Sequence, residues 1–275
     1  MSRIRVFLVF AGFLALAGCR SRDTAPGAVS PDTVFAEDFE SGSLGAWNDG
    51  VDTTRQQVVR DSTFARSGAH YLAVTYVAGG DGGWLTRFFE PGYDSLYASY
   101  YVRFPAGWQG GTKLIALYGS RTDNRWSALG KAGTCPTGTD FFATMLITEA
   151  SGNPGPVRFY TYYPAMAREP DGVTCWGRYG DGTETYSPPL TLSPGVWHHV
   201  ELWVKLNAPG SDDAAERFWI DGVPRGAWSG FSLRSSNVLR LNAVQLTFNR
   251  GVSGGPTAQR LFVDDLVILS GRPAP

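Results

Sequence analysis

The stretch from Tyr97 to Gly119 reads YASYYVRFPAGWQGGTKLIALYG and carries the clearest pattern in the sequence. From Tyr97 to Phe104, successive residues alternate between two sides of the chain, which is typical of a strand buried on one face. Pro105 and Gly107 end this strand, because proline gives no ladder donor and glycine accepts unusual backbone angles. The stretch therefore predicts a β-rich fold.

A second strand is predicted to begin at Lys113. Regular alternation places Lys113 and Leu117 on one face of this strand and Tyr118 on the other. A lysine at the start of an apolar strand can reach solvent along its aliphatic stem. It can also hold a cation above a groove that receives an anionic substrate, and the strand alone leaves both interpretations open.

The rest of the chain repeats the alternating pattern between residues 69 and 269, and the pair Asp221-Gly222 marks a hairpin. A content of 34 glycines, 17 prolines and 13% aromatic residues fits many short strands joined by turns. No window of the mature chain has a convincing helical period or a longer repeat. We predict one all-β domain over residues 34–270, built as a two-sheet β-sandwich, and a short tail at 271–275.

The charges nearly balance, with 24 Lys and Arg against 25 Asp and Glu. This balance gives no global basic field, so nucleic acid is not an expected partner. A balanced total charge is still compatible with a local basic groove. We expect a monomer.

Residues 1–18 are predicted to be a lipoprotein signal peptide. Arg3 and Arg5 precede the apolar segment Val6–Ala17, which is too short to span a bilayer. The run Leu16-Ala17-Gly18-Cys19 resembles the lipobox of bacterial lipoproteins, which implies cleavage before Cys19 and a lipid anchor on it. Arg20, in place of an aspartate, implies the outer membrane, and residues 19–33 read as a flexible tether.

Two further cysteines, Cys135 and Cys175, remain once Cys19 is lipidated. In an exported protein we expect them to form a disulfide. Two thiols without a nearby histidine make a poor zinc site.

Eight short motifs follow one another along the domain: Asp38-Phe39-Glu40-Ser41-Gly42, Phe104-Pro105-Ala106-Gly107-Trp108, Gly110-Gly111-Thr112-Lys113-Leu114, Tyr160-Thr161-Tyr162, Gly195-Val196-Trp197-His198, Asp221-Gly222, Phe248-Asn249-Arg250-Gly251 and Val263-Asp264-Asp265. In this order they resemble jelly-roll polysaccharide lyases, in particular the alginate and glucuronan lyases of families 14 and 20. The resemblance implies a concanavalin A-like β-jelly roll.

The resemblance also implies a β-elimination on a uronate polymer, with Lys113, Tyr160 and Tyr162 as the catalytic residues. Such a reaction needs a cation at the substrate carboxylate, a base for the acidic proton and an acid for the leaving oxygen. Tyrosine normally titrates near pH 10, so cationic neighbours would have to favour its ionised form. Arg158 is predicted to share a strand face with Tyr160 and to help.

One part of the family pattern is missing. The family carries a Ser-x-Arg pair on the strand that here reads FFATML from Phe141, so Phe142 and Thr144 are expected to replace it. Candidate substrate-binding residues that could compensate are Arg158, Arg103 and Arg87. Tryptophans that could stack on a sugar ring are Trp84, Trp108 and Trp176, for each of which core packing is equally compatible with the sequence.

No cofactor is required by this chemistry. Terminal strands of jelly rolls often pair and gather carboxylates, so Asp38, Glu40 and Asp265 are candidate ligands of a structural Ca²⁺. The alternative interpretation is that these are solvated charges near strand ends.

Two other functions remain open. The first is a carbohydrate-binding lipoprotein without catalysis, related to laminin-G and concanavalin-like domains, and the second is a structural envelope protein. A retaining glucanase is disfavoured because no strand has acids at alternate positions, and no Gly-x-Ser-x-Gly elbow supports a serine hydrolase.

Overall fold

The computed structural model describes residues 31–180, 184–186, 191–249 and 258–272. Within these ranges the chain forms two antiparallel sheets and no helix. The larger sheet contains β1 (Thr33–Glu37), β2 (Gln56–Arg60), β3 (His70–Tyr76), β5 (Ser95–Arg103), β9 (Thr185–Tyr186), β10 (Trp197–Lys205), β11 (Ala214–Ile220), β12 (Val223–Phe231) and β14 (Gln259–Leu269). The smaller sheet contains β4 (Trp84–Tyr93), β6 (Thr112–Arg121), β7 (Phe141–Thr148), β8 (Val157–Phe159) and β13 (Leu239–Thr247).

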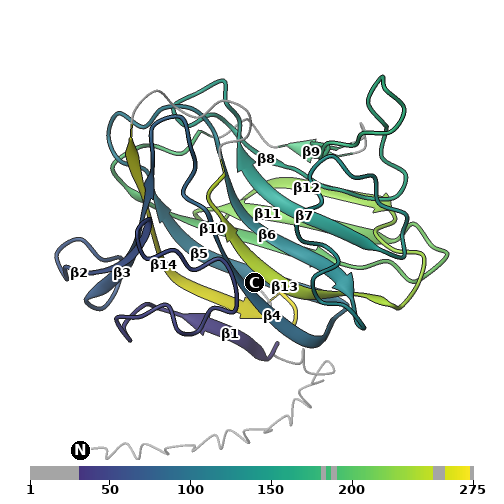
Figure 1. Ribbon diagram of the computed structural model, residues 1–275, viewed down its shortest axis with the longest axis horizontal. Coiled ribbons are helices and arrows are strands. Elements are labelled where there is room, and N and C mark those ends of the chain that lie inside the picture. Colours follow the sequence, from purple (N-terminus) through teal and green to yellow (C-terminus); the bar gives the residue numbers. More distant parts are fainter. Residues whose placement is uncertain (1–30, 181–183, 187–190, 250–257, 273–275) are drawn as a thin grey trace, which may run out of the picture. The chain divides into compact units, whose positions relative to one another are not determined.

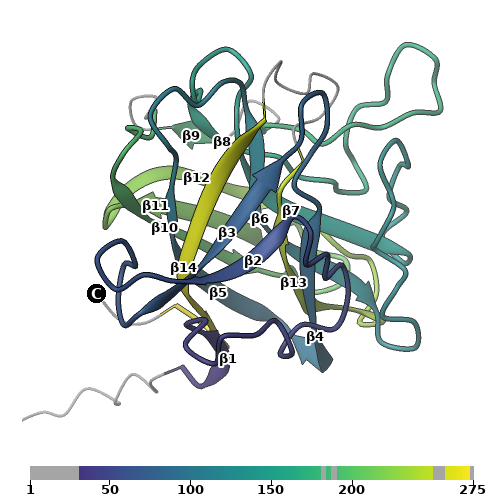
Figure 2. The same ribbon diagram turned by 60° about the vertical axis from the view of Figure 1, so that its left-hand side comes forward.

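The two sheets pack face to face, as the sequence predicted. The large sheet has the order β2-β3-β14-β5-β10-β11-β12-β9, with β1 paired to β14, and the small sheet has the order β4-β13-β6-β7-β8. Figure 1 shows the small sheet lying over the strands of the large one. In Figure 2, β2, β3 and β14 come to the front. In both sheets, strands distant in sequence lie side by side, with β14 between β3 and β5 and β13 between β4 and β6, which confirms the jelly-roll sandwich.

The core lies between the sheets. Leu117 of β6 and Val244 of β13 face Val102 of β5 and Leu202 of β10, and all four side chains are fully buried. Burying one such side chain stabilises the fold by about 1.5–3 kcal/mol. The other face of the small sheet points away from this core and carries the candidate functional site.

The predicted hairpin turn joins β11 to β12. Asp221 and Gly222 have φ angles of 54° and 74°, so both central residues lie in the left-handed region. A two-residue turn with this geometry matches the twist of the flanking strands, which explains the Asp-Gly pair.

Strand β6 does not keep the alternation expected from sequence. The pairing with β7 shifts register between Lys113, which lies opposite Ile147, and Ala116, which lies opposite Met145. Three steps along β6 therefore match two along β7, which is a β-bulge with one extra residue. The expectation that Lys113 and Tyr118 point to opposite faces was wrong, because the bulge turns Lys113 onto the outer face that carries Tyr118.

The expected disulfide between Cys135 and Cys175 is present. Beside it, the backbone N–H of Cys175 donates a hydrogen bond to the Gly133 carbonyl at 3.1 Å. The disulfide therefore joins the loop that follows β6 to the long loop that follows β8.

The predicted signal peptide, Cys19 and most of the tether lie outside the described residues. The described domain begins at Pro31, and its first and last strands pair at Thr33 and Leu269. Among the described residues, no helix is long and apolar enough to cross a membrane.

Candidate active site

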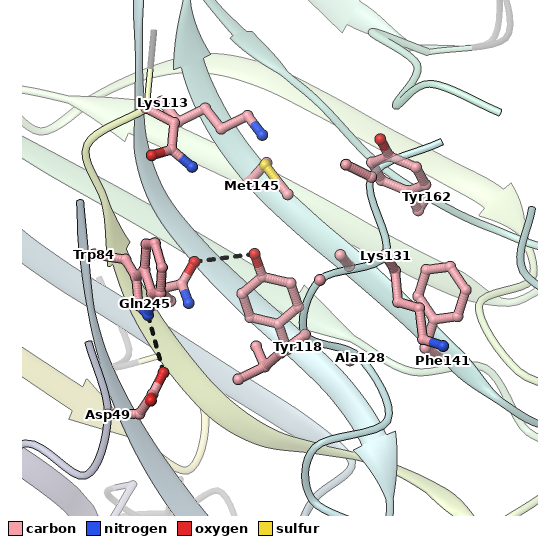
Figure 3. A pocket seen from close by; sticks show the side chains of 15 residues that line it. Asp49, Trp84, Lys113, Tyr118, Ala128, Lys131, Phe141, Met145, Tyr162 and Gln245 are labelled. Carbon is pink, nitrogen blue, oxygen red and sulfur yellow. Dashed lines mark hydrogen bonds between the residues drawn. The ribbon is translucent and has the colours of Figure 1, made fainter. Parts of the chain in front are cut away.

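A groove with a cavity of about 230 Å³ lies on the outer face of the small sheet (Figure 3). Alternate residues of three neighbouring strands form its floor, and residues 128–132 of the loop after β6 form one wall. The side chains that line the groove include Lys113, Tyr118, Lys131, Met145, Tyr162 and Gln245.

Lys113 brings an ammonium group into this groove. Its Nζ lies 5.5 Å from the centroid of the Tyr160 ring, within the range of a cation–π contact. Burial lowers the pKa of Lys113, and its ammonium forms no ion pair with any residue that the structure describes. A partly buried cation without a counter-charge favours an incoming anion, because the anion would restore the stability of its charged form.

Tyr160 and Tyr162 follow β8 and lie together beside this lysine. Their rings meet edge to face with centroids 5.7 Å apart. Burial raises the pKa of both phenols, whereas the interaction between the two side chains raises the pKa of Tyr160 further and lowers that of Tyr162. The backbone at Gly177 lowers the pKa of both phenols and that at Gly133 lowers the pKa of Tyr162 alone, so Tyr162 is the phenol better able to carry negative charge.

The loop after β8 holds the two tyrosines in place. The backbone of Thr161 exchanges two hydrogen bonds with Arg178, at 2.9 and 2.8 Å. Gly177 lies directly against the Tyr160 ring, since a Cβ at this position would be 2.5 Å from a ring carbon. Only glycine allows this close approach, and the Cys135–Cys175 disulfide ties the same segment to the groove wall.

Tyr118 and Gln245 occupy the centre of the groove, and the sequence analysis did not identify them. The Tyr118 hydroxyl donates to the Gln245 Oε1 at 3.1 Å (Figure 3), and Thr247 donates to the same oxygen at 2.7 Å. The Gln245 Nε2 in turn donates to Thr86 at 2.8 Å. Alternation along β13 could have suggested Gln245, a polar residue between the apolar Val244 and Leu246.

The two ends of the groove differ in charge. At one end Asp49 accepts a hydrogen bond from the Trp84 indole at 2.9 Å. At the other, Lys131 extends from the loop wall, with its Nζ 5.8 Å from the Phe141 ring centroid. Figure 3 shows Met145 between Lys113 and Tyr162 on the floor.

None of the three candidate substrate-binding arginines lines the groove. Arg158 faces the same side of the sheet as Lys113, but its guanidinium is paired with Glu149 at 3.0 Å, at the sheet edge. Arg87 donates to the Ala46 carbonyl at 2.7 Å, away from the groove. Arg103 belongs to the large sheet and packs on Phe64 at 4.2 Å. The expectations for Arg87 and Arg103 were wrong because the sequence did not show which face or sheet each strand presents. The expectation for Arg158 was wrong because Glu149 holds its guanidinium at the sheet edge.

The expectation that Trp108 could stack on a sugar ring was also wrong. It is 1% exposed and packs edge to face against Tyr76 and Phe104, so its ring is closed to a sugar. Trp84, which is 42% exposed, is the tryptophan that lines the groove.

The two residues expected to replace the Ser-x-Arg pair point into the core and not into the groove. Phe142 and Thr144 of β7 are fully buried on the core side, with Thr144 opposite Leu117. The outer face of β7 carries Phe141, Ala143 and Met145 instead. The floor of the groove is therefore less polar than the family pattern implied.

The proposed calcium ligands do not form a cluster. Glu40 accepts backbone hydrogen bonds from Ala69 and His70, both at 2.7 Å, and Asp265 accepts from the Ser67 hydroxyl at 2.7 Å. Asp38 accepts from the backbone of Glu40. Within the described ranges, no group of three or more His, Cys, Asp or Glu side chains is arranged to hold a metal ion. The structure thus gives these carboxylates a role in fixing loops.

Several solved structures of polysaccharide lyases are similar to this chain in fold. The marine family-14 alginate lyase of Aplysia kurodai is 15% identical with a TM-score of 0.65, over 86% of this chain and 99% of that one. A mutant of the alginate lyase Aly36B in complex with alginate trisaccharide is 17% identical with a TM-score of 0.62, over 88% and 99%. The endo-β-1,4-glucuronan lyase of Trichoderma reesei is 16% identical with a TM-score of 0.57, over 86% and 95%. At these identities the likeness shows the fold.

The family assignment comes from the sequence itself. No curated protein sequence matches the chain. The family model described as polysaccharide lyase 14, however, matches residues 68–255, from the start of β3 to just before β14. The chain therefore belongs to the polysaccharide lyase 14 family.

Proposed function

We propose that this protein cleaves a uronate-containing polysaccharide by β-elimination in the groove of the small sheet. The observation that carries the proposal is the ammonium of Lys113, which has no ion pair among the described residues and lies beside the Tyr160–Tyr162 pair in an open groove. Similar structures are named alginate and glucuronan lyases, which supports a uronate as the substrate class.

In this proposal Lys113 binds the carboxylate of the uronate next to the cleaved bond. Its positive charge stabilises the negative charge that develops when the adjacent carbon loses its proton. The approaching carboxylate also raises the lowered pKa of Lys113, so substrate binding keeps the lysine protonated.

Tyr162 is the base. Its phenolate removes the proton from the carbon beside the carboxylate, the electron pair of that C–H bond forms the new double bond, and the glycosidic C–O bond breaks. The phenol then returns the proton to the leaving oxygen, so one residue serves as base and acid. Tyr160, whose ring lies against that of Tyr162, is placed to donate a hydrogen bond to the phenolate once it forms.

Cellular location is a separate part of the proposal. The lipobox-like run ending at Cys19 supports a lipid-anchored enzyme of the bacterial outer membrane. Labelling cells with a radioactive fatty acid should mark the wild-type protein and leave the Cys19→Ala variant unlabelled. Equal labelling of the two would contradict the anchor.

The catalytic proposal is tested by incubating the protein with alginate, glucuronan and other anionic glycans and following the absorbance of unsaturated uronate. The wild-type protein should produce this signal with at least one polymer, and Tyr162→Phe should lose it. Tyr101→Phe is the matched control, because Tyr101 stacks on His199 in the large sheet, outside the groove. Binding without any cleavage would instead favour the non-catalytic carbohydrate-binding protein, whose support is the apolar floor around Met145.

A further inference from the structure

A second group of cations lies on the large sheet, outside the groove. Arg217 of β11, Arg225 of β12 and Arg272, which follows β14, line a cavity of about 340 Å³ together with Trp219. We call this the basic pocket. None of its lining residues belongs to the groove of the small sheet.

A bulge in the backbone creates this pocket. The pairing of β11 with β12 shifts between Phe218, opposite Gly226, and Trp219, opposite Pro224, so Arg225 is the extra residue. A bulge leaves its extra residue outside the regular ladder and re-aims its side chain. Arg225 is thereby directed into the pocket between its two strands.

The three guanidinium groups lack counter-charges. None forms an ion pair or hydrogen bond with any residue in the described part of the chain, and the Nε of Arg225 is buried without a hydrogen-bond partner. A buried donor without a partner costs stability unless a ligand or water satisfies it. The chain as a whole has a formal charge of −1, so this is a local feature and not part of a basic surface.

Two of the three arginines lie over indole rings of the large sheet. Arg272 lies 4.0 Å from the centroid of Trp219, and Arg217 lies 5.9 Å from that of Trp203. One carboxylate on this part of the sheet is Glu201, which is opposite Trp219, nearly buried, and accepts a hydrogen bond from the Tyr97 hydroxyl at 2.6 Å. It is already satisfied and does not neutralise the arginines.

We infer that the basic pocket is a second, non-catalytic binding site for a carboxylated polysaccharide. Planar guanidinium groups form paired hydrogen bonds with carboxylates, and several of them spread over neighbouring strands suit a polymer with repeated carboxylates better than a single ion. The site would hold the polymer on the protein independently of cleavage.

The experiment measures equilibrium binding to immobilised alginate, with the Tyr162→Phe change in every variant so that the polymer is not consumed. The Arg217→Ala/Arg272→Ala double variant should bind about tenfold more weakly, since two charge-assisted contacts are lost. The matched control is Arg60→Ala/Arg260→Ala, which removes two exposed arginines from β2 and β14 of the same sheet and should stay within about twofold.

Further arms separate this site from others. Adding Lys113→Ala should weaken binding by a factor that multiplies with the first, because the two sites are independent. Equal weakening by both arginine pairs, or no effect of Arg217→Ala/Arg272→Ala, would overturn the inference. So would loss of binding to vesicles of phosphatidylglycerol with unchanged binding to alginate, because the pocket would then serve an anionic membrane surface.

Discussion

The groove and the basic pocket both depend on a one-residue bulge, yet they offer different chemistry. In the groove the bulge of β6 turns Lys113 toward two phenols, and in the basic pocket the bulge of β12 releases Arg225 toward two other arginines. A lysine changes its pKa on burial and phenols can exchange a proton, whereas guanidinium groups stay charged. The same backbone irregularity thus gives a reactive site on one sheet and a binding site on the other, according to its neighbours.

The largest effect is expected from Lys113→Ala. Removing the cation that faces the substrate carboxylate should lower kcat/KM by about 10³-fold, as for other groups that stabilise developing charge. Binding at the basic pocket should not change. If kcat/KM fell by less than about tenfold, the groove would not depend on its lysine and the contrast between the two sites would be lost.

The disulfide should matter for the groove more than for the basic pocket. Its 40-residue separation gives a loop whose closure stabilises the fold by about 4 kcal/mol on the chain-entropy model. Cys135→Ser/Cys175→Ser should therefore lower the midpoint of thermal unfolding. It should also reduce activity below the unfolding temperature, because the wall at Lys131 and the segment at Gly177 lose their connection. Unchanged activity in the folded variant would contradict this role.

Glu216 lies between the two sites and tests whether they are coupled. It is fully buried on β11, accepts a hydrogen bond from Thr161 at 2.8 Å, and burial raises its pKa to about 8. Because the folded-state pKa exceeds the unfolded one, stability is lost as the pH rises from about 4.5 to about 8.

Glu216→Gln should remove this loss and raise the free energy of unfolding at pH 7 by about 3 kcal/mol. Denaturant titrations at pH 5 and pH 7 measure the difference. Cleavage and binding at the basic pocket should both stay within about twofold, since the amide side chain of the variant keeps an oxygen for Thr161. A large change in either would show that the sites communicate through this residue.

The pH dependence of kcat/KM tests whether Lys113 must be protonated. Lys113 must be protonated to bind the carboxylate, so activity should fall as the pH rises through its lowered pKa. In Lys113→Arg the guanidinium stays charged, and the falling limb of kcat/KM should move to higher pH, although the maximum is reduced. An unshifted limb would assign it to another group.

The smallest effect is expected from Lys131→Ala at the end of the groove. A half-exposed ammonium that meets a more distant carboxylate should change KM about threefold and leave kcat unchanged. Lys131→Arg should restore KM. An equal loss in kcat would place Lys131 at the reacting sugar.

Alternation predicted the sandwich correctly because strands such as β5 carry fully buried apolar side chains at every second position, from Leu96 to Val102. The motif containing Lys113 and the Tyr160-Thr161-Tyr162 segment led to three residues that the structure brings together. The bulge of β6 was hidden, because apolar residues occupy both of its faces and no break in the pattern marks the extra residue.

The arginines and Trp108 could not be placed from sequence for a related reason. The side of a strand that an arginine takes can be read from parity, but not which sheet contains the strand or which face is open. Arg87 and Arg103 lie in different sheets, and neither reaches the groove. Trp108 sits in a loop, where no periodicity signals burial.

The central claim is that the β6 bulge presents Lys113 to a uronate carboxylate beside Tyr162. It is tested most directly by a crystal structure of the Tyr162→Phe variant with a uronate oligosaccharide. The account predicts a sugar carboxylate within hydrogen-bonding distance of the Lys113 Nζ, and the carbon beside it facing the phenyl ring at position 162. An oligosaccharide bound in the groove with its carboxylates turned away from Lys113 would contradict it.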